Sequence, residues 1–521
     1  MPTAAVLRTL VAAAALATLP GIARAACGTS GMQLGFNLAG TVYGYTADPS
    51  SFLRDLVVMK SFGARTIRVF YLPCETGFTL RTGMGGGVVD RAKIAEVVAK
   101  TKTVLQYLAF ADMKAVVNFD FLPYYVHLPP LCAGVQWTDA YPNTPAGWNA
   151  FVADGTSWVK GIVAGLEASG LAGSILYYDL VNELHYPTGI TQDDSKLLRS
   201  LLTNVPTGPG RRGVSLLLPC QVDTPGGGPN LLLDLQATGK TLDFIDTHAY
   251  PESDYALEPT CGTDDARYDR KLALLSAAYP SACLVAGEFA SDACKVGETT
   301  AGAHEMTLLD QAEAAGARHA FHWWLWDGAT SCTPGAIRWG LGSDRDHPYD
   351  TLGRWADRFS RIAGGGDFET AGSDGGWSVG GPATVKARSR RGPSASQAAT
   401  GAWHLRMTAN GDAWLCSPQT TGFGGTRVAL SAYVRTNSAN GALGLDVHWW
   451  KAGQTGTVSR TIGGLSNAAF RNVQSTVDNG FVFDVPSGTT AVSVCFVGTR
   501  RTGCDPPDLV VDVDGVSLQG F

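Results

Sequence analysis

Short apolar, β-prone segments alternate with amphipathic segments from about residue 32 to residue 362. This alternation is typical of a parallel sheet, because parallel neighbours need crossover connections, usually helices. Two intervening stretches, Asp90–Ala111 and Gly147–Ser169, have the periodicity of amphipathic helices. The strand candidates are eight in number: Met32–Leu38, Arg65–Tyr71, Ala115–Phe121, Ile175–Asn182, Val214–Pro219, Phe244–Tyr250, Cys283–Glu288 and His319–Trp326. Eight such units in about 330 residues predict an α/β fold, a (β/α)8 TIM barrel with long loops.

Two of these strand candidates end in a glutamate. The fourth runs into Asn182 and Glu183, and the seventh ends at Glu288. Barrel enzymes carry their chemistry at the carboxyl ends of the strands, so both carboxyl groups are expected at one edge. Cleavage of a glycosidic bond needs two carboxyl groups, one to protonate the leaving oxygen and one to attack or to activate water. The pair therefore indicates a glycosidase.

The order of the motifs resembles that of the clan A glycoside hydrolases, nearest to the cellulase-like family 5. Asn182-Glu183 resembles the pair in which Glu is the acid/base and Asn binds the sugar 2-hydroxyl. Glu288 resembles the nucleophile, and Arg68 resembles the second-strand arginine that holds it. His248-Ala249-Tyr250 resembles the sixth-strand motif whose tyrosine hydrogen-bonds the nucleophile, and His248 is expected to support the site from behind.

The eighth strand candidate, with Trp323, Trp324 and Trp326, resembles the sugar platform of the same clan. Side chains alternate along a strand, so the three rings cannot all face one side. Alternate residues share a face, and we expect His322, Trp324 and Trp326 to point inward and Trp323 to pack under the helices. The chain also departs from family 5, because Leu184 follows Asn-Glu where proline is usual. The third strand candidate likewise lacks the usual histidine.

The physical roles of these groups agree with the resemblance. Glu288 must be ionised to attack an anomeric carbon, and a guanidinium (Arg68) and a phenol donor (Tyr250) favour that form. Glu183 must begin the cycle protonated and then serve as the base. Asp120 and Asp246 also lie near strand ends, and no role is assigned to them.

The character of the chain changes after the glycine run at 364–366. Residues 367–521 hold short β-prone runs between Gly, Asn, Ser and Pro, which predict an all-β jelly-roll sandwich following a catalytic domain at 26–363. Its two ends resemble carbohydrate-binding modules with a structural calcium site, and this implies Glu369 and Asp514 as ligands. Trp450 lies on the polar face of its strand and is the candidate stacking platform. A plain accessory sandwich is the alternative, and the glycine run is expected to act as a hinge.

Residues 1–25 have the apolar core and the small-residue end of a secretory signal peptide cleaved after Ala25, with a lipoprotein at Cys27 as the alternative. Eleven cysteines in an exported chain imply disulfides, and Cys283 with Cys294 and Cys495 with Cys504 are the expected local pairs. A net charge of −6 and the absence of a polybasic run argue against a nucleic-acid partner or an anionic membrane surface. No membrane span is expected, and the protein is expected to be a monomer.

Other catalytic signatures are missing from the sequence. There is no G-x-S-x-G elbow, no complete H-E-x-x-H and no phosphate-binding glycine loop with its lysine. The chain is therefore predicted to be a secreted, retaining glycoside hydrolase that cleaves a polysaccharide, endo-acting and without a catalytic cofactor. The alternatives are an exo-glycosidase or transglycosylase on the same barrel, and a polysaccharide-binding protein without activity.

Overall fold

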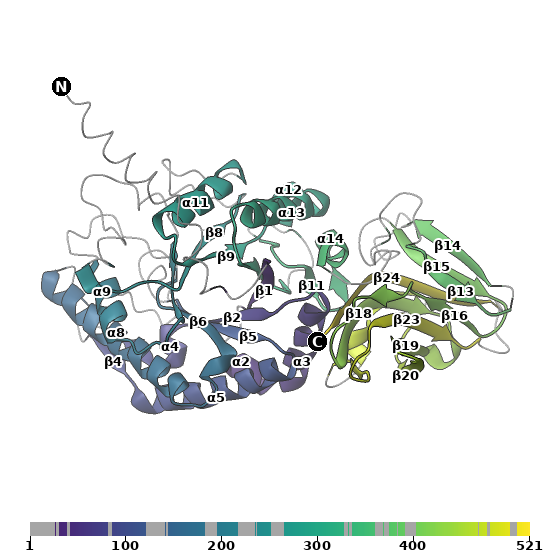
Figure 1. Ribbon diagram of the computed structural model, residues 1–521, viewed down its shortest axis with the longest axis horizontal. Coiled ribbons are helices and arrows are strands. Elements are labelled where there is room, and N and C mark those ends of the chain that lie inside the picture. The colour runs from purple at the N-terminus through teal and green to yellow at the C-terminus, as the bar shows by residue number, and fades with distance from the viewer. Residues whose placement is uncertain are drawn as a thin grey trace, which may run out of the picture.

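The computed structural model describes residues 27, 31–38, 42–81, 86–120, 141, 144–182, 195–216, 235, 237–251, 265–327, 332, 336–359, 368, 375–382, 384–390, 403–466, 468–476, 480–500 and 508–521. Figure 1 shows a barrel surrounded by helices on one side and a β-sandwich on the other, with the C-terminus where the two meet.

Eight parallel strands close into a barrel in the order β1-β10-β9-β8-β7-β6-β5-β2. The first strand pairs with the last, Gln33 opposite His319, so the circle has no free edge. The (β/α)8 prediction is confirmed, and all eight strand candidates form strands whose ends differ by a few residues. The strands are β1 (Gln33–Leu38), β2 (Thr66–Tyr71), β5 (Lys114–Phe119), β6 (Ile175–Asp179), β7 (Arg212–Leu216), β8 (Phe244–Ala249), β9 (Cys283–Phe289) and β10 (His319–Trp323).

The helices lie around the outside of this barrel (Figure 1). The two helices expected from periodicity are confirmed as α5 (Arg91–Phe110) and α8 (Pro145–Glu167). Asp90 caps α5 by accepting from the backbone N–H groups of Ala92 and Lys93, and Thr144 caps α8. The other helices are α2 (Val42–Ala47), α3 (Pro49–Ser61), α4 (Pro73–Thr76), α9 (Ser195–Asn204), α11 (Asp265–Ala278), α12 (Ala293–Val296), α13 (Glu298–Ala314) and α14 (Asp350–Phe359).

Each barrel strand turns one set of side chains to the helices and the other set inward. In β2, Ile67, Val69 and Tyr71 belong to the large core between strands and helices, which leaves Arg68 and Phe70 facing the interior. The inner space near the beginning of the strands is mostly apolar. It holds buried His319 and one apolar cluster, whose members are Cys27, Val116, Tyr177, Phe244, Cys283, Val285 and Phe321. Polar groups are therefore concentrated at the other end, where the strands finish.

The C-terminal part is a sandwich of two antiparallel sheets, which confirms the second half of the predicted fold class. One sheet has the order β13-β16-β23-β19-β20, and the other has the order β14-β15-β24-β18-β21. Residues such as Leu445 and Val447 fill the apolar space between them. The strands are β13 (Ser378–Gly380), β14 (Val385–Arg390), β15 (Trp403–Ala409), β16 (Ala413–Cys416), β18 (Arg427–Thr436), β19 (Leu443–Lys451), β20 (Gln454–Ile462), β21 (Arg471–Asn472), β23 (Ala491–Gly498) and β24 (Leu509–Gly520). The short β17 (Thr420–Thr421) pairs with β23, and β22 (Val482–Asp484) pairs with β18.

The sandwich packs against the barrel, and the expectation of a free appendage on a glycine hinge is wrong. Helix α3 contacts β18 and β24, and helix α14 contacts β24. Tyr433 and Phe470 of the sandwich are buried within the barrel's own apolar core. The hydroxyls of Ser61 and Ser517 hydrogen-bond across the contact at 2.6 Å in a buried position. A glycine run cannot act as a hinge when the two parts it joins share a core.

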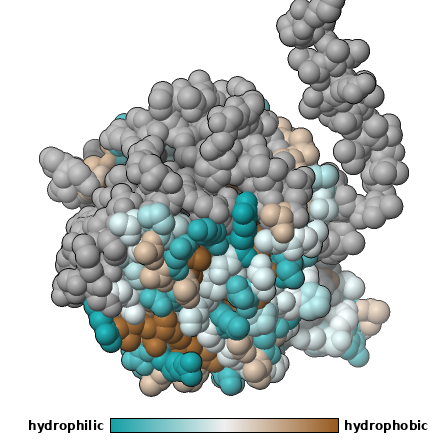
Figure 2. All heavy atoms as spheres, turned by 90° about the vertical axis from the view of Figure 1, so that its left-hand side faces the viewer, coloured by the Kyte–Doolittle hydropathy of each residue, from teal (hydrophilic) through white to brown (hydrophobic). Residues whose placement is uncertain are grey.

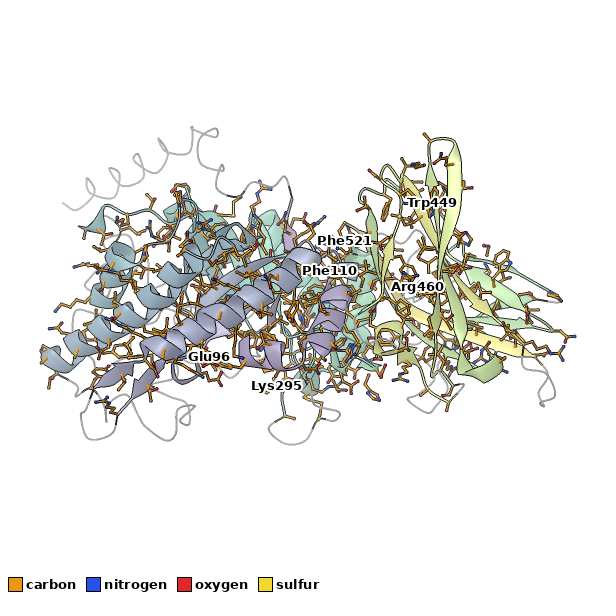
Figure 3. The ribbon with its side chains drawn as sticks, turned by 90° about the horizontal axis from the view of Figure 1, so that it is seen from below. Glu96, Phe110, Lys295, Trp449, Arg460 and Phe521 are labelled. Carbon is orange, nitrogen blue, oxygen red and sulfur yellow. A yellow bond between two sulfur atoms is a disulfide. The ribbon has the colours of Figure 1, made fainter. Side chains whose placement is uncertain are left out.

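Cation–aromatic contacts close the edge of the same interface. Arg427 donates to the carbonyl of Phe110 at 2.7 Å, and its guanidinium lies 4.7 Å from the ring centre of Phe521. The ammonium of Lys60 lies 5.0 Å from the Phe521 ring on the barrel side. Figure 3 shows Phe110 and Phe521 side by side at the junction, with Arg460 and Trp449 farther out on the sandwich.

Three disulfides occur among the described residues: Cys27–Cys283, Cys294–Cys332 and Cys416–Cys495. Both expected local pairs are wrong. Cys283 begins β9 and Cys294 lies beyond its far end, so the seven-residue strand separates them by about 20 Å at 3.3 Å per residue, well beyond the reach of a disulfide. Cys495 faces Cys416 on the neighbouring strand, and Cys504 lies outside the described residues.

No helix in the described ranges is long and apolar enough to span a membrane. The predicted signal peptide lies outside those ranges and stays a prediction. Figure 2 shows the end of the barrel far from the sandwich, where hydrophilic residues are mixed with a hydrophobic patch low on the described surface.

Candidate active site

The carboxyl ends of the barrel strands bring a set of buried polar side chains together. β2 supplies Arg68, β8 supplies His248, and β9 supplies Glu288, its last residue but one. The register between β8 and β9 shifts between Thr247 and His248, so that His248 lies opposite Glu288. Bulges of this kind re-aim side chains next to active sites. The extra residue, Gly287, lies in β9, and it turns Glu288 into the barrel beside His248, which faces inward by the alternation of β8.

Arg68 is the centre of this set and is fully buried. One terminal nitrogen, Nη1, donates to Glu288 Oε1. The other, Nη2, donates to Asp179 Oδ2 at 2.5 Å and to Asn182 Oδ1 at 2.8 Å. Asp246 Oδ2 lies 3.7 Å from the same nitrogen. A planar guanidinium can hold several oxygens in fixed directions at once, which an ammonium cannot.

Glu288 is held from both sides of its carboxylate and is nearly fully buried. Besides the bond from Arg68 to Oε1, the hydroxyl of Tyr250 donates to Oε2 at 2.7 Å. His248 Nδ1 lies 3.3 Å from Oε2. Donors to both oxygens favour the ionised form and fix the carboxylate plane. Arg68, His248 and Tyr250, three residues singled out from the sequence, therefore surround the predicted nucleophile.

Asn182 lies beside this centre, just after β6. Its Oδ1 accepts from Arg68 and, at 3.1 Å, from Asn118 Nδ2, while its own Nδ2 donates to Asp120 Oδ1 at 3.3 Å. Asn118 also donates to Asp179 at 2.8 Å. The amide is thus held in one orientation before any ligand arrives. Glu183, the next residue, lies outside the described residues, so its separation from Glu288 stays a prediction.

Two further carboxyl groups, Asp179 and Asp246, share the charge of Arg68. Burial raises the pKa of Asp179, and the negative charge of Asp246 raises it further. Burial also acts to raise the pKa of Asp246, but the charge of Arg68 and a hydrogen bond from His248 outweigh it and lower that pKa. Tyr177 donates to Asp246 at 3.0 Å. One buried cation, Arg68, therefore faces three carboxyl groups, Asp179, Asp246 and Glu288.

Backbone geometry makes room for the cluster. A Cβ on Gly287 would come 2.6 Å from the carboxyl carbon of Asp246, so only glycine fits there without a shift. The carbonyl of Gly287 accepts from Asn37 Nδ2 at 3.0 Å. Asn37 thereby ties β1 to the strand that carries Glu288.

The tryptophans at the end of β10 differ from the parity expectation. His322 faces the helices and lies 3.0 Å from Glu305 of α13. Trp323 therefore faces inward, with its ring 5.4 Å from that of Phe70 and 6.2 Å from that of Tyr250. The expectation for Trp323 is wrong because the inward set is His319, Phe321 and Trp323, not the set that contains His322.

Trp326 also departs from the expectation of an inward ring. Its indole N–H donates to Asp55 on α3 at 2.9 Å, on the helical side. The strand ends at Trp323, and Trp324 has a left-handed backbone with φ 71°. Alternation therefore stops before Trp326. The Trp324 ring stays next to that of Trp323, with 5.5 Å between centroids.

In the sandwich, β19 alternates as predicted. Leu445 and Val447 are buried in the core and Trp449 packs against it, while Trp450 lies half-buried on the other face beside His448. Whether Trp450 binds sugar stays a prediction. Of the two calcium candidates, Asp514 is buried and accepts from the N–H of Gly515, and Glu369 lies outside the described residues. Within the described ranges, Asp514 joins no group of three or more potential metal ligands.

Several members of the cluster were not singled out from the sequence. Asp179, Asn118 and Asn37 were given no role, and Trp323 was placed on the wrong side. The usable signal was a polar residue at an inward position of an otherwise apolar strand, such as Asp179 two residues after the inward Tyr177. Using this signal requires knowing which residues of the strand face inward. The adjacent Tyr177 and Tyr178 do not reveal this, because either could face the interior.

No protein-family model matches the chain, and no curated protein matches it in sequence. Among solved structures, glycoside hydrolases of family 5 match it. One is a broad specificity endoglucanase (GH5-4) from an uncultured bacterium, with 16% sequence identity and a TM-score of 0.40 over 61% of this chain and 94% of that chain. A second is a family 5 xyloglucanase from Paenibacillus pabuli, with 11% identity and a TM-score of 0.42 over 60% of this chain and 93% of that chain.

A third match is an exo-β-1,4-mannosidase from Opitutaceae bacterium strain TAV5. It has 17% identity and a TM-score of 0.40 over 58% of this chain. The present chain spans about half of its length, 53%.

Proposed function

We propose that this chain is a retaining glycoside hydrolase that cleaves a polysaccharide by double displacement. The observation that carries the proposal is the Glu288 carboxylate at the end of β9, held by Arg68 on one oxygen and by Tyr250 on the other. A buried carboxylate with a donor on each oxygen, at the carboxyl end of a barrel strand, suits a nucleophile. Glu183 is the second carboxyl group of the mechanism.

In the first step Glu288 attacks the anomeric carbon while Glu183 donates its proton to the leaving oxygen. The bond between sugar and Glu288 replaces the glycosidic bond, and the negative charge on Glu288 disappears. In the second step Glu183 takes a proton from water, which attacks the same carbon and releases Glu288 as a carboxylate. Arg68 and Tyr250 stabilise that carboxylate at the start and at the end of the cycle.

Asn182 is proposed to contact the sugar 2-hydroxyl, a contact that strengthens at the oxocarbenium-like transition state. Its orientation is supported by Arg68, Asn118 and Asp120. Trp323 and Trp324 offer the aromatic surface next to the site. The two steps need no cofactor. The same proposal includes endo-action, export through the N-terminal signal sequence and sugar binding by the sandwich. The three disulfides fit export to an oxidising compartment.

The test compares Glu288→Ala and Glu183→Ala on activated aryl glycosides and on a panel of polysaccharides. Glu288→Ala should lose turnover on every substrate. Glu183→Ala should retain part of its turnover on the aryl glycoside, whose leaving group needs little protonation. Azide should restore turnover of Glu183→Ala with formation of the β-azide, because the small anion replaces the base-activated water.

The matched control is Glu313→Gln, a largely exposed glutamate of α13, which should keep wild-type turnover. Absence of turnover by the wild type across the panel, with binding retained, would contradict the proposal and favour the binding protein without activity. Azide rescue of Glu288→Ala but not of Glu183→Ala, with formation of the β-azide, would reverse the two roles. The products from polymer would separate endo-action from exo-action and from transglycosylation.

A further inference from the structure

A buried carboxylate on the helical side of the barrel lies behind the proposed centre. Glu305 belongs to α13 and its side chain is almost fully buried. Oε2 accepts from the indole N–H of Trp355 at 2.9 Å and lies 3.0 Å from Nε2 of His322. Oε1 accepts from the backbone N–H of Ser291 at 3.4 Å. A buried charge that serves only packing is costly, so three polar contacts on one carboxylate call for an explanation.

One branch of these contacts reaches the tryptophan turn. His322 is in β10, and its Nδ1 lies 2.9 Å from the carbonyl oxygen of Trp324, to which it donates. Trp324 has φ 71°, a left-handed conformation that costs a bulky residue on the order of 1–3 kcal/mol. Such a conformation persists only where the surroundings enforce it. His322, whose Nε2 lies 3.0 Å from Glu305 Oε2, is the group that holds this peptide.

The segment Trp323–Trp324 also contacts the residues around Glu288. The ring of Trp323 meets that of Tyr250 edge to face, and the hydroxyl of Tyr250 donates to Glu288. The second branch is shorter, because Ser291 lies only three residues after Glu288. A single carboxylate on α13 thus contacts the segment after β9 and, through His322, the segment after β10.

We propose that Glu305 is a positioning residue that fixes the end of β9 and the turn after β10 relative to each other, and so aligns Glu288, Tyr250 and the Trp323–Trp324 surface. The expected effect of Glu305 on turnover rests on the proposed function. Glu305 itself lies on the helical side of the barrel and does not take part in the chemistry. Removal of the Glu305 side chain should displace Glu288 and Tyr250 while leaving both residues in the site.

The experiment compares Glu305→Ala and Glu305→Gln with Glu313→Gln, a control on the same helix. Misplacement of a catalytic group by about 1 Å can cost on the order of 100-fold in rate. We therefore expect Glu305→Ala to lower kcat by about 10- to 100-fold, with KM changed by less than about 3-fold. Glu305→Gln keeps one acceptor oxygen and should lose less.

A second readout does not depend on turnover. In protein labelled with 5-fluorotryptophan, the 19F resonances of Trp323 and Trp324 can be assigned with Trp323→Phe and Trp324→Phe. Glu305→Ala and Glu305→Gln should shift or broaden these two resonances, and Glu313→Gln should leave them unchanged. The soluble Glu305→Gln variant carries the test if Glu305→Ala does not fold.

The outcomes separate this inference from the proposed function. A folded Glu305→Ala protein with wild-type kcat, or with unchanged Trp323 and Trp324 resonances, would overturn the inference and leave the glycosidase proposal intact. A lower melting temperature with unchanged kcat would likewise reduce Glu305 to a stabilising residue. A wild-type protein without turnover would overturn the proposed function, and the 19F comparison would still decide the role of Glu305.

Discussion

The shared core between barrel and sandwich predicts that the two parts unfold together. Tyr433 is a residue of β18 in the sandwich, yet its buried ring lies in the apolar core of the barrel. A Cβ on Gly515 would come 2.9 Å from this ring and 3.6 Å from Leu352 of α14, which shows how closely strand, ring and helix meet. Tyr433→Ala would therefore open a cavity at the interface.

The size of the effect follows from burial and from the size of the unfolding unit. Truncation of a buried aromatic residue to alanine costs about 3–5 kcal/mol. With an unfolding entropy of about 2.1 cal/mol/K per residue, a unit of about 500 residues loses about 1 °C in Tm per kcal/mol, and a sandwich of about 155 residues alone loses about 3 °C. A coupled molecule should therefore fall by about 3–5 °C, and an independent sandwich by about 9–15 °C.

Differential scanning calorimetry distinguishes these cases. The wild type should show one transition, and Tyr433→Ala should move that transition by the smaller amount. Phe496→Ala, in the centre of the sandwich core, is the matched control for a buried aromatic residue and should move the same transition. Arg460→Ala, exposed on β20, should shift it by less than about 0.5 kcal/mol in stability. Two transitions in the wild type, of which Tyr433→Ala moves only one, would refute the reasoning.

Three further predictions concern buried or half-buried groups. Asp512 accepts from Arg406 and Arg435; burial acts to raise its pKa, but Arg406 and His404 outweigh burial and lower it. The stabilising effect of Asp512 should be present above about pH 4 and be lost as pH falls further, and Asp512→Asn should cost about 3–5 kcal/mol at pH 7 in urea unfolding. Burial and the charge of Asp246 raise the pKa of Asp179 to about 7. The stability of the wild type relative to Asp179→Asn should therefore fall as pH rises from about 4 to 7, and a rise of this difference in urea titrations would contradict the raised pKa. Trp450→Ala should weaken retention on insoluble polysaccharide while leaving turnover of small glycosides unchanged, and equal retention of both proteins would remove Trp450 as a platform.

The sequence predicted the barrel well because its signal is repeated. Eight apolar runs at regular spacing admit few arrangements, and the strands found differ from the expected ones only at their ends. The neighbours of Glu288 could also be anticipated, because the resemblance to the clan A glycoside hydrolases implied Arg68, His248 and Tyr250. Residues at the ends of neighbouring parallel strands converge whatever the loops do.

What could not be predicted depends on local irregularity or on distant partners. The inward parity of β10 failed at Trp323, and alternation ended at Trp324 because the backbone turns left-handed there. To predict Asp179 and Asn118 as site residues, one must know which residues of their strands face inward. The sequences of these strands allow either set. The packing of Tyr433 against α14 and the partners of Cys283 and Cys495 join residues far apart in sequence, and no periodicity reports such contacts.

The bridge between Cys27 and Cys283 has a consequence for biosynthesis. Its halves are 256 residues apart, and the first half emerges from the ribosome long before the second. The pairing of β1 with β10, which closes the barrel, must likewise wait for residues near 319. Cys27 therefore stays available to form non-native disulfides with Cys74, Cys132, Cys220 or Cys261, which all emerge before Cys283. A thiol–disulfide isomerase should accelerate maturation of the whole protein, and Cys27→Ser should reduce that dependence at the expense of a less firmly closed barrel.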